Sequence, residues 1–281
     1  MRKLARQILA RPSLRSVRRV LRYFEGSRPR FLNFFPKESQ LTESSRRINF
    51  LNLGKIHFLE IGVQDGFTFE GVRSARKLGV DPYAGFHTWW LPYGAKFSKM
   101  DSAAFFSRDS KETFDFIFID GLHTAEASYE DFIGAANMIA DDGGVILIDD
   151  VLPSDFLSSL PTYAESKREK KLAGIDDGRW YGDVWRLAWL LISEYEQLDI
   201  VLIGNGSEEH CQAAVLVKPG LKLRLESKAS DLDFMMSLRY EEVVDSGPTS
   251  IRGRALNEET GLKLALDMIH KQRDGHKQGS L

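Results

Sequence analysis

Short runs of apolar residues alternate with amphipathic stretches through the middle of the chain. The apolar runs lie at residues 57–63, 78–81, 114–120, 145–150, 200–203 and 213–217. Between them, apolar residues recur at helical spacing over residues 67–77, 129–140 and 180–196. Unbroken apolar strands that alternate with helices are typical of a mostly parallel sheet whose two faces are both covered. The pattern therefore predicts an α/β fold, a Rossmann-like sheet with helices on both faces.

The first 50 residues differ in composition from the rest of the 281-residue chain. Residues 1–30 contain ten lysines and arginines and one acid, so this segment carries +9, whereas the remaining 28 basic and 39 acidic side chains sum to −11. Ser13 can cap a helix whose apolar residues recur from Leu14 to Phe24, with arginines on the other face. We predict a basic helical N-terminal extension over 1–50, a Rossmann-like domain over 51–220, and a C-terminal extension over 221–281 that is partly frayed.

Three interpretations of the basic helix are open. It packs on the domain or on a second subunit, it lies on an anionic membrane surface, or it is a targeting segment. We favour packing, which includes a homo-oligomer, and keep peripheral membrane contact as the alternative. A basic segment on an acidic body disfavours a nucleic-acid enzyme.

The cysteine content and the hydropathy of the chain restrict its environment. The single cysteine, Cys211, excludes an internal disulfide framework and suits a reducing compartment. No apolar run approaches the ~20 residues needed to span a bilayer. We therefore expect a cytoplasmic protein, with a membrane-peripheral location as the alternative.

Acidic residues follow the predicted strands. They are Glu60, Asp81, Asp120 and the pair Asp149 and Asp150. In parallel sheets, ligands bind outside the carboxyl ends of the strands, near the point where the strand order reverses. Helix capping explains one such acid, but four strand ends in succession favour a ligand site.

The turn after the first strand indicates which ligand binds there. It reads Glu60-Ile61-Gly62-Val63-Gln64-Asp65-Gly66, so Gln64 stands where a dinucleotide fingerprint has its second glycine. This disfavours NAD, whereas Gly62 and Gly66 still permit a tight turn. Asp81 follows Glu60 by 21 residues, a position from which an acid accepts hydrogen bonds from ribose hydroxyls. An adenosine ligand that carries a cation in place of phosphates, such as S-adenosylmethionine, suits a site lined by these carboxylates.

Several blocks together resemble a known family. They are LEIGVQDG at 59–66, GVDP at 79–82, IDGLH at 119–123, the paired glycines and aspartates at 143–150, and WYGDVW at 180–185. Over residues 53–219 the chain resembles class I S-adenosylmethionine-dependent methyltransferases, and more narrowly the macrocin-type sugar O-methyltransferases and their relatives from glycan gene clusters. The resemblance implies that Glu60, Gly62, Gly66 and Asp81 line the cofactor site, with Thr68 after the turn. We add Asp120 as a further candidate for contact with the cofactor.

The sequence departs from the family at one block, MDSAAFF at residues 100–106. Ala103 stands where the family often has an aspartate ahead of two phenylalanines. Either Asp101 or Ser102 takes its place near the adenine, or this contact is missing.

Asp120, His123, Asp149 and Asp150 are the candidates for chemistry. We predict that the three aspartates bind Mg²⁺, a hard cation with a preference for oxygen ligands, and that His123 is the general base. The resemblance implies the same arrangement. In a competing interpretation the aspartates cap helices or contact the cofactor, and there is no metal.

The leading function is an S-adenosylmethionine-dependent O-methyltransferase that acts on a hydroxyl of a small molecule or glycan, with Mg²⁺ as an optional second cofactor. The alternatives are a metal-independent methyltransferase of another acceptor, an oxidoreductase or hydroxylase on the same sheet, and a binding scaffold with a degenerate pocket. Residues 151–179 are expected to form a lid or to select the substrate. Trp180, Trp185 and Trp189 are predicted core residues of one helix, and Trp89 and Trp90 are candidates for stacking on a sugar or on adenine.

Overall fold

In this computed structural model, the described residues are 41–51, 56–74, 76–86, 91, 94–204 and 211–279. The predicted basic helix within residues 1–30 and the pair Trp89 and Trp90 lie outside them. Among the described residues, no helix is both long enough and apolar enough to cross a membrane.

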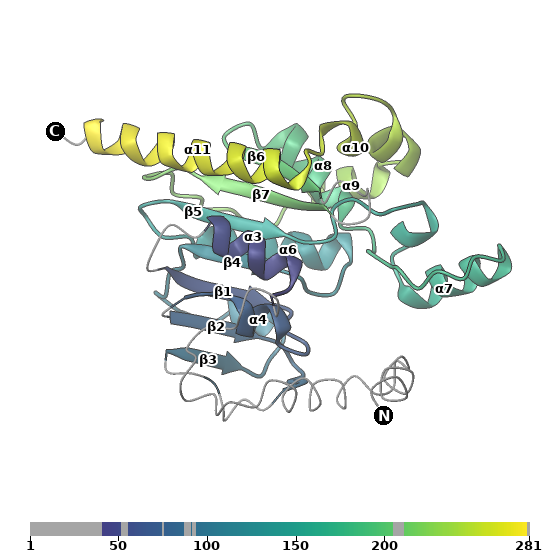
Figure 1. The fold of residues 1–281 in the computed structure, drawn as a ribbon, viewed down its shortest axis with the longest axis horizontal. Helices are drawn as coiled ribbons and strands as arrows, with labels where there is room; N and C mark the ends of the chain where they lie inside the picture. Colours follow the sequence, from purple (N-terminus) through teal and green to yellow (C-terminus); the bar gives the residue numbers. More distant parts are fainter. Residues whose placement is uncertain are drawn as a thin grey trace, which may run out of the picture.

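The described residues form a seven-stranded sheet in the order β3-β2-β1-β4-β5-β7-β6 (Figure 1). The strands are β1 (His57–Ile61), β2 (Arg76–Val80), β3 (Ala95–Ser98), β4 (Phe116–Ile119), β5 (Gly144–Ile148), β6 (Asp199–Gly204) and β7 (Cys211–Val217). The first five are parallel, and β7 is antiparallel to both β5 and β6. The strand order reverses between β1 and β4, which places the expected ligand site at their carboxyl ends. The predicted fold class is confirmed.

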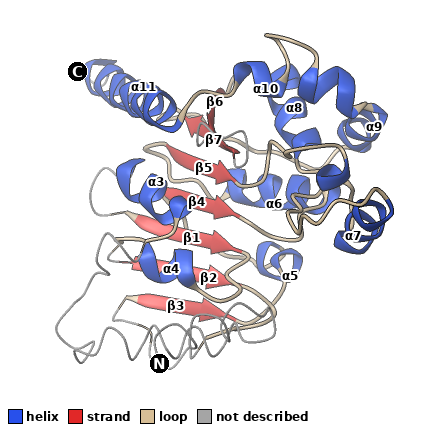
Figure 2. Ribbon diagram, turned by 45° about the vertical axis from the view of Figure 1, so that its right-hand side comes forward, coloured by secondary structure: helices blue, strands red, loops and turns tan. Residues whose placement is uncertain are grey.

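Helices cover both faces of this sheet (Figure 2). They are α3 (Glu43–Leu51), α4 (Phe67–Gly71), α5 (Ser102–Phe106), α6 (Ala125–Asn137), α7 (Tyr163–Leu172), α8 (Trp185–Glu194), α9 (Ala229–Ser237), α10 (Ile251–Arg254) and α11 (Glu258–Gly279). Side chains alternate along each strand, so Leu59 and Ile61 join the core beneath α6 and α8, whereas Phe58 joins the core beneath α3, α4 and α11. Both cores are apolar because a parallel sheet is buried on both sides.

Several element boundaries differ from the sequence prediction. The predicted helix over 67–77 ends at Gly71, and Lys77 lies in β2, where its buried Nζ donates to the carbonyls of Phe69 and Val72 at 2.5 and 3.1 Å. The lysine thereby satisfies carbonyl groups at the end of α4. The predicted helix over 180–196 begins only at Trp185. At the C-terminus, where fraying was expected, α11 remains helical to Gly279.

Side chains of the C-terminal segment, residues 221–279, form hydrogen bonds with the loop that follows β5. Arg252 Nη2 donates to the carbonyl of Pro153 at 3.1 Å, and the Tyr240 hydroxyl lies 3.5 Å from the same oxygen. Asp231 of α9 accepts hydrogen bonds from the hydroxyls of Tyr129 and Tyr195 at 2.8 and 2.9 Å. Through these contacts residues 221–279 support the loop after β5 and the helix α6, next to the carboxyl edge of the sheet.

The turn after β1 passes very close to the end of β4. Gly62 has φ +85°, and a Cβ at this position would lie 1.8 Å from the carbonyl oxygen of Asp120. Its amide donates to the carbonyl of Val80 at 3.0 Å, so the turn is also tied to β2. Only glycine combines this backbone conformation with this close approach.

We expect Gly62→Ala to lower the free energy of unfolding by at least about 2 kcal/mol, because the left-handed backbone and the carbonyl contact both oppose a Cβ. Urea denaturation of the purified variant measures this loss. Gly178→Ala is the matched control, because a Cβ there meets nothing within 4 Å, and its stability should stay within about 0.5 kcal/mol of the wild type. Equal stability of the two variants would contradict the close approach.

A buried acid on α6 adds a pH dependence. Asp131 is 3 % exposed, and burial raises its pKa to about 6, although a hydrogen bond from Ser102 of α5 opposes the increase. The unfolded chain releases this proton near the ordinary value of 3.8, whereas the folded chain keeps it up to about pH 6. Stability at this position therefore falls as the pH rises through that window.

Asp131→Asn removes the ionisable group, so the variant should lose less stability than the wild type between pH 4 and pH 7. The measurement is the urea midpoint at several pH values across this range. Asp142→Asn, at an exposed position, controls for the loss of one carboxylate elsewhere. Parallel pH profiles for the wild type and Asp131→Asn would refute the burial effect.

Candidate functional site

The predicted acids gather at the carboxyl edge of β1, β2, β4 and β5. Glu60 lies within β1, Asp81 follows β2, Asp120 follows β4, and Asp149 and Asp150 follow β5. Asp120 is half-buried, while the other four are nearly inaccessible. Carboxylates this poor in solvent contact need donors or a cation close by. Parallel strands thus bring together residues from four separate segments.

Asp81 connects the glycine turn to the edge of β2. Its Oδ2 accepts the amide hydrogen of Gln64 at 2.8 Å, and its Oδ1 accepts that of Tyr83 at 2.7 Å. Gln64 itself has φ 44°, so the turn is held in an unusual conformation. Each carboxylate oxygen keeps a second lone pair for a ligand. Asp81 therefore stabilises the turn as well, a structural role that the sequence did not predict.

Glu60 is a buried carboxylate that lacks a full set of partners. It is 2 % exposed, and its Oε2 has no hydrogen-bond partner among the described residues. Burial and the charge of Asp120 raise the pKa of Glu60 well above its usual range, against the opposing effect of Lys77. An unsatisfied buried oxygen of this kind suits a ligand that brings a cationic hydrogen-bond donor.

The remaining predicted cofactor residues have local partners. The hydroxyl of Thr68 lies 3.0 Å from that of Thr42, just ahead of α3. Asp101 is the N-cap of α5 and accepts the amide hydrogen of Ala104 at 2.7 Å. Ser102 donates to Asp131, as described above. A role near the adenine for Asp101 or Ser102 stays a prediction.

His123 lies between two of the predicted aspartates. Its Nδ1 is 2.5 Å from Asp150 Oδ2, and its Nε2 is 3.5 Å from Asp120 Oδ1. Burial lowers the pKa of His123, but the hydrogen bond and charge of Asp150, with the charges of Asp120 and Asp149, outweigh burial and raise the pKa to about 9. The imidazole therefore lies in a strongly negative electrostatic environment.

Asp120, His123 and Asp150 form a group that could hold a metal ion, since their ligand atoms all lie within 4.8 Å of one another. Asp149, the third predicted ligand, stands beside this group. Its Oδ1 accepts hydrogen bonds from the Asp150 amide at 3.0 Å and from Gln212 Nε2 at 3.1 Å. The structure thus brings two of the three predicted ligands together with the predicted base, and the full ligand set stays a prediction.

The backbone around His123 is unusual and is held by the 180–185 motif. His123 has φ 59°, a left-handed conformation that is rare outside glycine. Its carbonyl accepts the amide hydrogen of Asp183 at 3.1 Å, and a Cβ on Gly182 would lie 1.7 Å from that carbonyl. Asp183 Oδ1 accepts the amide hydrogen of Ala125 at 2.7 Å. Through these two hydrogen bonds Asp183 supports the loop that carries His123.

Two further residues of the site were missed by the sequence analysis. Trp180, predicted to be a helical core residue, precedes α8, and its ring centroid lies 5.2 Å from that of His123. Gln212 is fully buried on β7, where it joins Ser44 of α3 to Asp149. The signal for Gln212 was available, because it is the one polar side chain in the otherwise apolar strand of residues 211–217.

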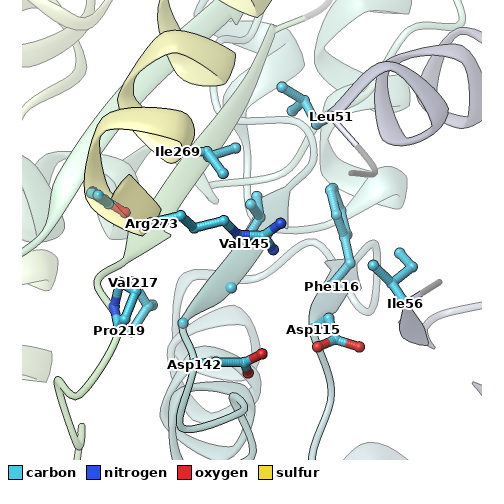
Figure 3. A pocket seen from close by; sticks show the side chains of 13 residues that line it. Leu51, Ile56, Asp115, Phe116, Asp142, Val145, Val217, Pro219, Ile269 and Arg273 are labelled. Atoms are coloured by element: carbon cyan, nitrogen blue, oxygen red, sulfur yellow. The ribbon is translucent and has the colours of Figure 1, made fainter. Parts of the chain in front are cut away.

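A separate pocket opens at the opposite edge of the sheet (Figure 3). Its wall is largely apolar, with Asp115, Asp142 and Arg273 as its charged side chains. It contains none of the strand-end acids. A smaller pocket borders Asp120, His123 and Asp149. Because ligands of such sheets bind at the carboxyl ends of the strands, we place the functional site at the smaller pocket.

A family model matches the central part of the chain. Residues 59–151 match a family described as a methyltransferase domain. No curated protein sequence matches the chain.

Solved structures similar to this chain include three methyltransferases. The N-methyltransferase NodS from Bradyrhizobium japonicum is 16 % identical, with a TM-score of 0.39 over 63 % of this chain and 94 % of its own. The O-methyltransferase TomG from Streptomyces achromogenes is 13 % identical, with a TM-score of 0.42 over 73 % and 90 %. MycE from the mycinamycin biosynthetic pathway, solved with Mg and S-adenosylhomocysteine, is 18 % identical, with a TM-score of 0.42 over 74 % and 56 %.

The family match begins in β1 and ends just after the aspartate pair that follows β5. It therefore includes the glycine turn, Asp81, the His123 loop and both aspartates. Taken with the strand order and the carboxylate-lined switch point, this match favours a methyltransferase over the oxidoreductase alternative. Residues 59–151 of the chain are therefore similar to a methyltransferase domain.

Proposed function

We propose that the chain transfers a methyl group from S-adenosylmethionine to a hydroxyl oxygen of a small molecule or glycan, with a divalent metal and His123 as general base. The observation that carries this proposal is the cluster of His123 with Asp120 and Asp150, at the strand ends where a methyl acceptor would meet the cofactor. The resemblance to the macrocin-type branch supports the same assignment.

The residues around the glycine turn fit the cofactor. The orphaned, buried Oε2 of Glu60 suits the cationic amino group of the methionine part. Asp81 keeps lone pairs for the ribose hydroxyls, and Gly62 and Gly66 keep the turn tight beneath the ligand. The bound cofactor supplies a methyl group that is already activated by its positive sulfonium. The protein then has to position the acceptor oxygen and remove its proton.

The acidic cluster fits a divalent ion. Asp120 and Asp150 supply hard oxygen ligands, and Asp149 adds a third carboxylate whose orientation Gln212 fixes. A metal in this position lowers the pKa of a hydroxyl bound to it. The negative environment that raises the pKa of His123 is the environment in which a cation is favourable.

His123 is oriented to accept the proton of the acceptor. Asp150 holds Nδ1, which leaves Nε2 as the nitrogen that takes the proton from the acceptor hydroxyl. In the absence of a cation the raised pKa keeps Nε2 protonated at neutral pH. Positive charge beside the three aspartates would lower the pKa of His123 and release the base form.

A second candidate is a metal-independent methyltransferase. The hydrogen bond between His123 and Asp150 is complete without an ion, as in histidine–aspartate pairs that act as general bases elsewhere. In this candidate the aspartates orient the histidine, the positive sulfonium of the bound cofactor takes the place of the metal in lowering its pKa, and chelation has no effect on turnover.

The cofactor assignment predicts a loss of S-adenosylhomocysteine affinity in Asp81→Asn. The exchange removes a charge-assisted hydrogen bond worth about 1.5–3 kcal/mol, so the affinity should fall by about 10- to 150-fold in calorimetric titration. Asparagine keeps one acceptor oxygen for the turn. Asp115→Asn is the matched control, because Asp115 accepts the His57 amide hydrogen at 2.5 Å at the far edge of the sheet. Unchanged affinity in folded Asp81→Asn would remove Asp81 from the cofactor site.

The metal and base assignments predict a second set of results, measured with radiolabelled methyl donor and a panel of sugars, polyols and catechols. His123→Asn should lower kcat by about 10²- to 10⁴-fold, the usual effect of losing a general base, and leave S-adenosylhomocysteine affinity within threefold. Excess EDTA should abolish turnover, and Asp120→Asn and Asp150→Asn should behave like chelation. Full turnover after exhaustive chelation, with loss of turnover in His123→Asn, would instead establish the metal-independent candidate.

A further inference from the structure

Exposed apolar side chains gather on the segments beside His123. Nine large hydrophobic side chains are exposed among the described residues, and five of them lie either on the His123 loop or within residues 151–179. These five are Leu122, Phe156, Tyr163, Leu172 and Ile175, with exposed fractions between 46 % and 76 %. Two of them are connected to His123: Leu122 precedes it in the chain, and Tyr163 contacts Trp180, whose ring contacts the imidazole. Exposed apolar groups beside a polar site are a signature of a ligand-binding surface.

Trp180 is the member of this region that reaches the chemistry. Its ring contacts the His123 imidazole at 5.2 Å between centroids, with 41° between the ring planes. The ring of Tyr163, the first residue of α7, meets Trp180 edge-on at 6.0 Å. The helix α7 lies on the side of the sheet to which the parallel strands point (Figure 1). Trp180 therefore lies between the predicted base, His123, and Tyr163 of α7.

The indole is held in place from three directions. Its Nε1 donates to the carbonyl of Leu160 at 2.8 Å. The carbonyl of the preceding residue, Arg179, accepts a hydrogen bond from Lys170 Nζ at 2.8 Å, and Nζ also donates to Ser158 Oγ at 2.7 Å. The amide of the following residue, Tyr181, donates to the Ser158 carbonyl at 3.0 Å.

Lys170 makes this arrangement rigid. It is 2 % exposed, and a buried ammonium is costly unless all its donors are satisfied. Its third partner is Asp177 Oδ2 at 3.3 Å. Moving the backbone at Trp180 would strain the bonds of Lys170 and Ser158, and turning the indole away from His123 would break its bond to the Leu160 carbonyl. The ring is thus a preformed surface.

We propose that Trp180, with Tyr163 at its edge, is the binding surface for the ring of the methyl acceptor. This inference rests on the proposed function and adds the chemistry that the acceptor must have. The acceptor is a ring with an apolar face and neighbouring hydroxyls, such as a pyranose or a catechol. Its face stacks on the indole, and one of its hydroxyls reaches His123 and the acidic cluster.

A structural role for Trp180 makes a different prediction. If the indole only supports His123, its loss moves the base and lowers kcat. If it binds the acceptor ring, its loss raises KM and weakens ring binding, while kcat and cofactor affinity change little. Binding and turnover therefore separate the two roles.

The experiment uses saturation-transfer NMR and calorimetry on the full chain with S-adenosylhomocysteine and Mg²⁺. The probes are methyl α-rhamnopyranoside, catechol and glycerol, an acyclic triol. We expect at least one ring probe to bind, and Trp180→Leu to weaken its binding by about 5- to 10-fold. Trp180→Phe should restore most of the affinity. Phe50→Leu is the matched control, since Phe50 is an exposed aromatic on α3 and lies outside this region.

The two ring probes distinguish the sources of this chemistry, because the one whose binding depends on Trp180 identifies a sugar or a catechol acceptor. The inference is overturned if neither ring probe binds, if glycerol binds as well as the rings, or if Trp180→Leu binds them unchanged. It is also overturned if Trp180→Leu lowers kcat with KM unchanged for an acceptor that is methylated. Binding that depends on Trp180 without methyl transfer supports the surface and refutes the proposed function instead.

Discussion

The proposed chemistry of this protein depends on one buried contact between two loops, the hydrogen bond from His123 to Asp150. Both residues have φ 59°, a conformation that costs a non-glycine residue on the order of 1 kcal/mol or more. Hydrogen bonds from neighbouring residues offset this cost. The Asp183 amide donates to the carbonyl of His123, and Asp149 Oδ1 accepts the amide hydrogen of Asp150. The imidazole and the carboxylate face each other because both backbones are held in this way. Strain of this kind is concentrated where geometry matters more than stability.

The sheet could be predicted from the sequence where its strands are buried on both faces. The runs that became β4 and β5 are unbroken and apolar, and that of β1 is apolar except for His57 and Glu60, because helices cover these strands on both sides. The edge strand β3 has partly exposed positions and a lysine in its four residues, so its sequence carries no such signal. The helix α7 is mostly exposed and lacks an apolar face, and its presence within 151–179 was not predicted for the same reason.

The candidate site was predictable as far as strand ends determine it. Glu60, Asp81, Asp120, Asp149 and Asp150 were identified because parallel strands bring their carboxyl ends to one edge. Trp180 and Gln212 were not, because their positions depend on tertiary contacts. Trp180 reaches His123 only through the bonds of Lys170 and Leu160, and no spacing in the sequence reveals these.

The residues of the site form two groups with different proposed roles, one at the sheet edge and one in the segment 151–179. The sheet edge holds the residues assigned to the cofactor and the acidic cluster, and these are tied to the backbone by the crossing of Gly62 beneath Asp120. The segment 151–179 holds Tyr163 and the contacts that orient Trp180, and it is anchored through its own buried lysine rather than through the strands. A change in this segment can therefore alter the surface beside His123 without disturbing the glycine turn or Asp81. For that reason the proposed function assigns the acceptor preference to residues 151–180 and the cofactor preference to the strand ends.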